Sequence, residues 1–289
     1  EMLFICSSAS LLDKTLEEIQ TKLPSTSFQR LYSIADKKQP LNIFLNLDQN
    51  YPLVSEIVSE DSKISVSDFA DWVYYDMNVR SNQLAFNGVA ITNDSLPNYL
   101  NLFNATEPLP NTTPFIAPRQ SEAILSYKFE NHGVFEKNQR QFLNKSVKND
   151  SVFSAVEELG MAYMGDERAI ILKTFGSEDF LGFIETIQKS TINYQGNGIR
   201  ELNRTDFLNS AFEPLVENFN ANYCTILENV FVFAQKREIL QMVISDYKKG
   251  VTFDKNPIYV AASKNLGTSA NILFISSAGH VEQLLKDNF

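Results

Sequence analysis

The sequence predicts an α+β protein whose antiparallel sheets carry helices packed mainly on one face, with recurring hairpin–helix units and a partial internal duplication. Short segments rich in apolar residues are separated by turn residues, which indicates hairpins and therefore antiparallel pairing. Segments with an i, i+4, i+7 apolar stripe follow several of these hairpins, as expected for helices covering a sheet. Two such stretches, near the two ends of the chain, also resemble each other.

The composition and charge of the chain argue against nucleic-acid binding, docking to anionic membranes and membrane spanning. The chain is 44% hydrophobic and 21% charged, which is typical of a folded protein. Its formal charge of −10 disfavours nucleic acid and anionic membrane surfaces as partners, because both attract Lys and Arg clusters. We expect no membrane span in this chain, since no apolar run approaches the roughly 18 residues that a spanning helix needs.

The first elements expected are a strand at Leu3–Cys6 and a helix with its stripe at Leu12, Leu16 and Ile19. An apolar run that meets a cysteine could be a lipoprotein cleavage site, but Ile5 is not the small residue that such a site requires. We therefore interpret this stretch as ordinary structure in which Cys6 is a small buried thiol.

The middle of the chain predicts a hairpin, a short helix and a rigid loop. Trp72–Arg80 and Gln83–Ala90 flank Ser81–Asn82, and Ser95–Phe103 follows as a short helix. Glu107–Arg119 contains four prolines and predicts a connector without helix.

Further hairpins are expected in the second half of the chain. A helix should begin at Ser177 with Phe180, Phe183, Ile184 and Ile187 on one face. The expected strand pairs are Met161–Met164 with Ala169–Thr174, Ile192–Gln195 with Ile199–Leu202 around Gly196–Gly198, and Tyr223–Leu227 with Val230–Ala234 around Glu228–Asn229.

The duplication aligns Leu3–Leu12 with Phe231–Leu240. Later matches join Leu31–Tyr32 to Ile258–Tyr259, Asn42–Phe44 to Asn271–Leu273, and the short helices expected at Tyr51–Val58 and His280–Lys286. This pattern predicts the back part of one unit at residues 1–145, lacking its first strand, and the front part of a second unit at residues 146–289. One continuous α+β domain is the alternative. We expect both ends of the chain to lie inside a longer parent protein.

Motifs for catalysis, metal binding and cofactor binding are missing from the sequence. Neither His132 nor His280 lies in a triad motif, and a solvated or capping role is expected for both. Metal-ligand spacings and phosphate-binding glycine loops do not occur, so we expect no catalytic residues, no metal and no cofactor. A hydrolase that uses Asp and Glu remains an alternative, because convergent carboxylates leave no motif.

One predicted strand has a candidate binding surface. In an extended Asp71–Arg80, one face is apolar and should point into the core, at Val73, Tyr75, Met77 and Val79. The other face combines the only tryptophan with a tyrosine and polar groups, a composition used to contact sugars or proteins. The candidate binding residues are Trp72, Tyr74, Asp76, Asn78 and Arg80. The alternative is that a helix covers the two aromatic residues.

The chain resembles a family of uncharacterised bacterial extracytoplasmic, lipoprotein-like proteins in "LFICSSASLLDKTLEEI", "FADWVYYDMNVRSNQLAFNG", "NVFVFAQKREILQMVISDYKKG" and "ANILFI". This resemblance implies export of the parent to the periplasm or cell surface, possible membrane anchoring and further modules, but no reaction and no catalytic residues. We therefore expect a non-catalytic binding or assembly module of a larger exported protein, contacting protein or glycan. The alternatives are the hydrolase and a pure structural scaffold.

Overall fold

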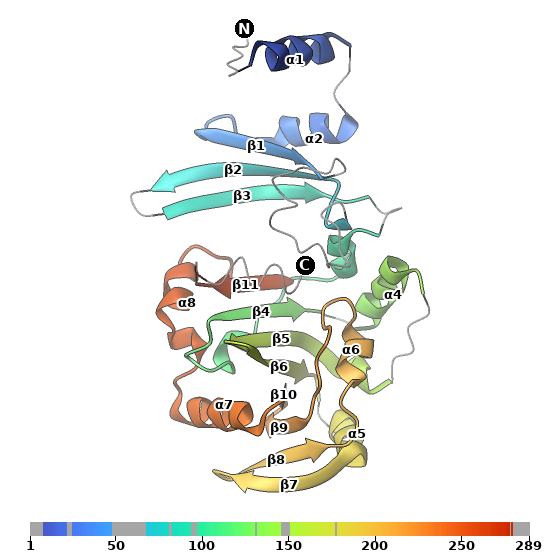
Figure 1. Ribbon diagram of the computed structural model, residues 1–289, viewed down its shortest axis with the longest axis vertical. Coiled ribbons are helices and arrows are strands. Elements are labelled where there is room, and N and C mark those ends of the chain that lie inside the picture. The colour runs from blue at the N-terminus through green and yellow to red at the C-terminus, as the bar shows by residue number, and fades with distance from the viewer. Residues whose placement is uncertain are drawn as a thin grey trace.

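The computed structural model describes residues 8–21, 25–47, 68–80, 83–93, 97–130, 132–145, 151–176, 178–277 and 279. Within these residues the strands form two antiparallel sheets, one of three strands in the order β1-β2-β3 and one of eight in the order β11-β4-β5-β6-β10-β9-β8-β7 (Figure 1). The predicted α+β class with antiparallel sheets is therefore confirmed. No described helix is long and apolar enough to cross a bilayer.

The three-stranded sheet contains β1 (Leu41–Asn46), β2 (Trp72–Arg80) and β3 (Gln83–Ile91). Two helices precede it, α1 (Ala9–Thr21) and α2 (Thr26–Ile34). Helix α2 begins where Ser25 Oγ accepts a hydrogen bond from the Phe28 amide, so the side chain satisfies one of the unpaired amides of the first turn.

The eight-stranded sheet is built from the rest of the chain. Its strands are β4 (Ala123–Lys128), β5 (Val156–Met164), β6 (Glu167–Thr174), β7 (Gln188–Tyr194), β8 (Asn197–Leu202), β9 (Tyr223–Leu227), β10 (Val230–Ala234) and β11 (Ile272–Ser276). The α-helices are α4 (His132–Leu143), α5 (Glu178–Ile187), α6 (Phe207–Phe212), α7 (Arg237–Lys249) and α8 (Pro257–Ala262). The 3-10 helices are η2 (Tyr99–Phe103), η3 (Thr113–Phe115), η4 (Ser151–Ala155) and η5 (Phe253–Lys255).

Alternate residues of the central strands enter two different cores. In β10, Phe231 and Phe233 belong to an aromatic core, whereas Val232 lies in an aliphatic core on the opposite face. Helices α4, α5 and α6 supply the aromatic core, and α7 and α8 supply the aliphatic one. Every residue of β4 and β10 is buried for this reason. Among the described helices the predicted bias toward one face is small.

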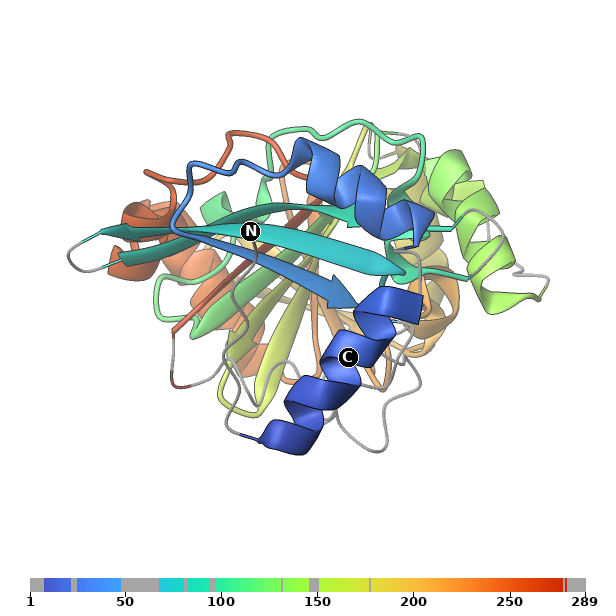
Figure 2. The same cartoon turned by 90° about the horizontal axis from the view of Figure 1, so that it is seen from above.

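The three-stranded sheet lies beside β11, and its strands cross those of the larger sheet at an angle when seen from above (Figures 1 and 2). Phe69 connects the two, because its ring stacks on Tyr99 at 6.0 Å and its carbonyl accepts from the Leu100 amide at 3.4 Å. The outer part of this small sheet extends away from the core. Val73 is buried but Val79 is 57% exposed, so the predicted core face of β2 is wrong at its outer end.

The predicted hairpins are present. The β9–β10 pair turns at Glu228–Asn229, and the β2–β3 and β5–β6 pairs follow the expected segments. In the β7–β8 pair, Tyr194 faces Asn197, so the turn is Gln195–Gly196 and begins one residue earlier than predicted. Both turn residues have positive φ, at 51° and 80°, as a two-residue hairpin turn requires.

The duplication stays a prediction. The order α1–α2–β1 matches α7–α8–β11 except for η5, which lies between α7 and α8, and α1 and α7 each contain 13 residues. Leu3–Cys6, Tyr51–Val58 and His280–Lys286 lie outside the described residues. The predicted division at 145/146 does not separate two sheets, because β4 on one side pairs with β5 on the other.

A buried carboxylate holds the proline-rich loop, which contains only the short helix η3, against the larger sheet. Glu158 on β5 is 1% exposed and pairs with Lys128 Nζ at 3.5 Å. It also accepts hydrogen bonds of 2.6 to 2.9 Å from Thr112 N, Thr113 N, Thr113 Oγ1 and Ser126 Oγ. This carboxylate therefore anchors the middle of the loop, and backbone bonds at Leu109 and Ala117 hold its two ends.

Candidate functional site

The predicted binding surface on β2 is covered at its aromatic end. Trp72 is half-buried, with its ring 5.7 Å from that of Phe28 on α2. Tyr74 is 3% exposed, and its hydroxyl donates to Asn42 Oδ1 at 2.8 Å and accepts from the Asp36 amide at 3.0 Å. These two aromatic side chains therefore do not form an open stacking surface.

The polar end of the same strand is more accessible. Asp76 and Asn78 are half-buried, and Asp76 Oδ1 lies 3.5 Å from the Asn87 amide nitrogen on β3. The Arg80 backbone ends β2, whereas its side chain is outside the described part of the structure. Trp72, Tyr74, Asp76 and Asn78 alternate along β2 as predicted, but Phe28 of α2 packs against Trp72 and Phe44 of β1 stacks on Tyr74.

His132 lies in the aromatic core. It is 2% exposed, and its ring is 5.7 to 6.4 Å from those of Phe129, Phe135, Phe153 and Phe212. Its Nε2 atom has no hydrogen-bond partner among the described residues, and burial lowers the pKa of the imidazole to about 4. The predicted solvated or capping role is therefore wrong for His132, while His280 lies outside the described residues.

Other reactive groups are equally enclosed. Cys224 is a buried free thiol whose pKa is raised by burial, and Cys6 lies outside the described residues. The Tyr99 and Tyr127 hydroxyls are hydrogen-bonded to each other at 2.8 Å, and burial raises the pKa of both. Within the described ranges, no three His, Cys, Asp or Glu side chains lie together as a metal site.

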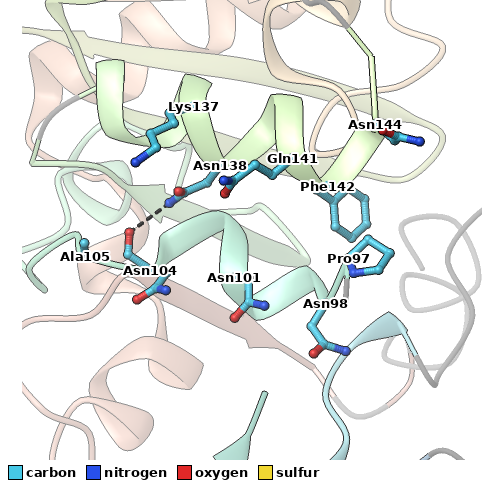
Figure 3. Close-up of a pocket in the computed structure, with 10 residues that line it drawn as sticks. All are labelled: Pro97, Asn98, Asn101, Asn104, Ala105, Lys137, Asn138, Gln141, Phe142 and Asn144. Atoms are coloured by element: carbon cyan, nitrogen blue, oxygen red, sulfur yellow. Dashed lines mark hydrogen bonds between the residues drawn. The ribbon is translucent and has the colours of Figure 1, made fainter. Parts of the chain in front are cut away.

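A groove between η2 and α4 is a different candidate. It encloses about 720 Å³ and is lined by Pro97, Asn98, Asn101, Asn104, Ala105, Lys137, Asn138, Gln141, Phe142 and Asn144. Figure 3 shows amide side chains on both walls, with Lys137 at one end and Pro97 beside Phe142 at the other. The volume is within the roughly 300–1,000 Å³ common for ligand pockets.

The spacing of the amides explains why they face the groove. On one wall, Asn98 and Asn104 are the caps of η2 and Asn101 lies midway, so the three are separated by three residues each. A 3-10 helix has three residues per turn, which places such positions on one face at about 6 Å intervals. On α4 and its end, Asn138, Gln141 and Asn144 repeat the same interval.

The amide side chains of Asn98, Asn101 and Asn138 fix the positions of the two walls of the groove. Asn138 Nδ2 donates to the carbonyls of Leu102 at 3.2 Å and Asn104 at 2.8 Å, which ties α4 to η2 (Figure 3). Asn98 Oδ1 accepts from the Asn93 amide at 2.8 Å, and Asn101 Nδ2 donates to the Asn93 carbonyl at 3.0 Å. Side chains of the lining therefore fix α4 against η2 and η2 against the segment after β3.

The outer side chains are available to a ligand. Asn104, Gln141, Asn144 and Lys137 are all exposed, and within the described ranges their side chains have no hydrogen-bond partner. Phe142 is half-buried because its ring packs edge-on against Tyr99 at 6.3 Å. The groove thus combines amides that both donate and accept with a cation and a fixed aromatic ring.

No protein family, characterised protein or solved structure matches this chain. The chemistry of the groove must therefore be interpreted from its own residues. The sequence contained a signal for it, in two N-x-x-[NQ]-x-x-N patterns at residues 98–104 and 138–144. Each pattern alone is typical of an exposed polar segment, and only the packing of α4 on η2 brings the two rows to one groove.

Proposed function

We propose that this chain is a non-catalytic binding module of a larger exported bacterial protein, and that it binds a glycan in the groove between η2 and α4. The two rows of amide side chains that line this groove carry the proposal. Export rests on the resemblance of the sequence to extracytoplasmic, lipoprotein-like proteins.

Amides suit a ligand rich in hydroxyls. Each Asn or Gln side chain offers a carbonyl acceptor and two N–H donors, and each sugar hydroxyl can likewise donate and accept. The exposed amides of Asn104 on η2 and Gln141 on α4 both line the groove, so different sugars of one glycan could bond to them (Figure 3). Asn138 already ties the two walls together, so binding a ligand would cost little conformational entropy in the protein.

The lining favours a glycan over a protein segment. Peptide grooves bind side chains in apolar pockets in addition to the main chain. Here the apolar side chains are those of Pro97, Ala105 and Phe142, and only Phe142 offers an aromatic ring. A ring of this kind can contact the C–H face of a sugar while amides bind its hydroxyls.

The lining also supports binding without turnover. None of the ten lining residues is Asp, Glu, His or Cys, the side chains that most often act as acids, bases or nucleophiles. A carboxylate-dependent hydrolase would need two acids on either side of the scissile bond. The groove as described supplies none.

The test is binding of the 289-residue chain to an array of defined oligosaccharides, followed by calorimetric titration with those that bind. Gln141→Ala and Asn104→Ala should each weaken binding about five- to tenfold, because each removes a hydrogen-bonding group without leaving a buried partner unpaired. The matched control is Gln120→Ala, which removes an exposed amide from the loop before β4.

The control should bind as the unsubstituted chain does, and all variants should melt at the same temperature. Absence of any bound oligosaccharide overturns the proposal, as does binding that both groove substitutions leave unchanged. Binding of extended peptides instead of glycans would assign the groove to a protein partner and also overturn it.

A further inference from the structure

The groove has an asymmetric charge. Among its ten lining residues Lys137 is the one charged side chain, and it lies at the end away from Phe142 (Figure 3). On the assumption that the proposed glycan-binding function holds, we infer that the glycan is acidic, with the carboxylate of a uronic acid placed beside Lys137.

The surroundings leave Lys137 available for such a group. Its neighbours on α4, Glu136 and Arg140, form an ion pair with each other. Lys145, just beyond the helix, pairs with Glu213 Oε2 at 2.6 Å. In the described part of the chain Lys137 itself has no ion-pair partner.

The net charge of the groove lining is positive, whereas that of the whole chain is negative. The sequence has a formal charge of −10, whereas α4 contains two cations, Lys137 and Arg140, against one anion, Glu136. An acidic glycan is repelled by most of an acidic surface, so a cationic groove would direct it to one place.

The two ends of the groove predict an orientation for the ligand. At the cationic end, the Lys137 ammonium can donate to a carboxylate. At the other end, Pro97 and Phe142 offer apolar surface, and the Phe142 ring is held edge-on by Tyr99. The carboxylate of one sugar should therefore lie near Lys137 while the C–H face of the next packs on Phe142.

The experiment compares acidic oligosaccharides with their own neutral forms. Tetramers of galacturonate, glucuronate and mannuronate are each titrated into the chain by calorimetry, beside the same tetramers with every carboxyl methyl-esterified. At least one acid should bind about three- to tenfold more tightly than its ester at low salt, with the difference reduced at high salt.

The variant Lys137→Met should remove this preference, because it keeps an unbranched side chain and loses the charge. Lys249→Met, at the exposed end of α7, makes the same charge change on the face of the sheet opposite to the groove. It should keep the preference, and both variants should melt as the unsubstituted chain does.

Two results overturn the inference. If no acid binds better than its ester, or if Lys137→Met keeps the preference, the ligand is not selected by its charge at this site. The glycan-binding proposal survives these results when neutral oligosaccharides still bind and Gln141→Ala still weakens them. It fails as well when neither acids, esters nor the array glycans bind.

Discussion

The buried imidazole of His132 should make the protein less stable in mild acid. Burial lowers its pKa to about 4, against about 6.5 for the unfolded chain. As the pH falls below about 6.5 the unfolded state takes up the proton first, so the free energy of unfolding decreases until the folded state titrates near pH 4. The full difference of about 2.5 pKa units corresponds to about 3 kcal/mol, of which about 2 kcal/mol is lost by pH 5.

The substitution His132→Met removes the titrating group and introduces an apolar side chain that can adapt to the surrounding phenylalanines. Urea unfolding at pH 7.5 and pH 5.0 measures the effect. At pH 7.5 the free energy of unfolding of the variant should lie within about 1.5 kcal/mol of the unsubstituted chain. Between the two pH values the unsubstituted chain should lose about 2 kcal/mol more than the variant.

The control His280→Met removes the other histidine of the chain and should leave the pH dependence unchanged. Equal losses for His132→Met and the unsubstituted chain would refute the reasoning. So would a proton NMR titration in which the His132 imidazole has a pKa near 6.5.

Two further predictions concern the packing around β5. Glu158→Gln should lower the free energy of unfolding by about 3 kcal/mol in urea titrations, because it breaks a buried ion pair, whereas Glu157→Gln, at a side chain 29% exposed, should cost less than about 1 kcal/mol. Equal effects would contradict the role assigned to Glu158. Gly160→Ala should lower the melting temperature, because its Cβ would lie 2.0 Å from Thr113 Oγ1. Gly182→Ala in α5, where nothing described lies within 4 Å, should instead stabilise by about 0.5–1 kcal/mol, and a gain at both glycines would show that β5 is not tightly packed.

Local chemistry made the hairpins predictable. Turn residues and alternation are encoded within about ten residues, and the β9–β10 turn at Glu228–Asn229 lies where the sequence places it. The turn between β7 and β8 was displaced by one residue, because Gln195 adopts the positive φ that the glycines of the pattern were expected to supply.

The sites depended on contacts between distant segments. Alternation along β2 places Trp72 and Tyr74 on one face, but the rings that pack on them, Phe28 and Phe44, come from earlier parts of the chain. The sequence around His132 predicts a solvated or capping side chain, but in the folded chain Phe153 and Phe212 pack against its ring. The groove requires two amide rows from different elements, and neither pattern indicates the other.

The anchoring of the proline-rich loop has a consequence for how this chain can vary. Surface connections ordinarily accept insertions and deletions, because the extra residues can extend into solvent. Thr112 lies in this loop and Ser126 on β4, yet both donate to the same carboxylate, Glu158, so the path between them has fixed end points. A residue added beside Thr112 or Thr113 would move the amides that donate to Glu158. Differences in length are therefore expected to be tolerated in other loops and not in this one.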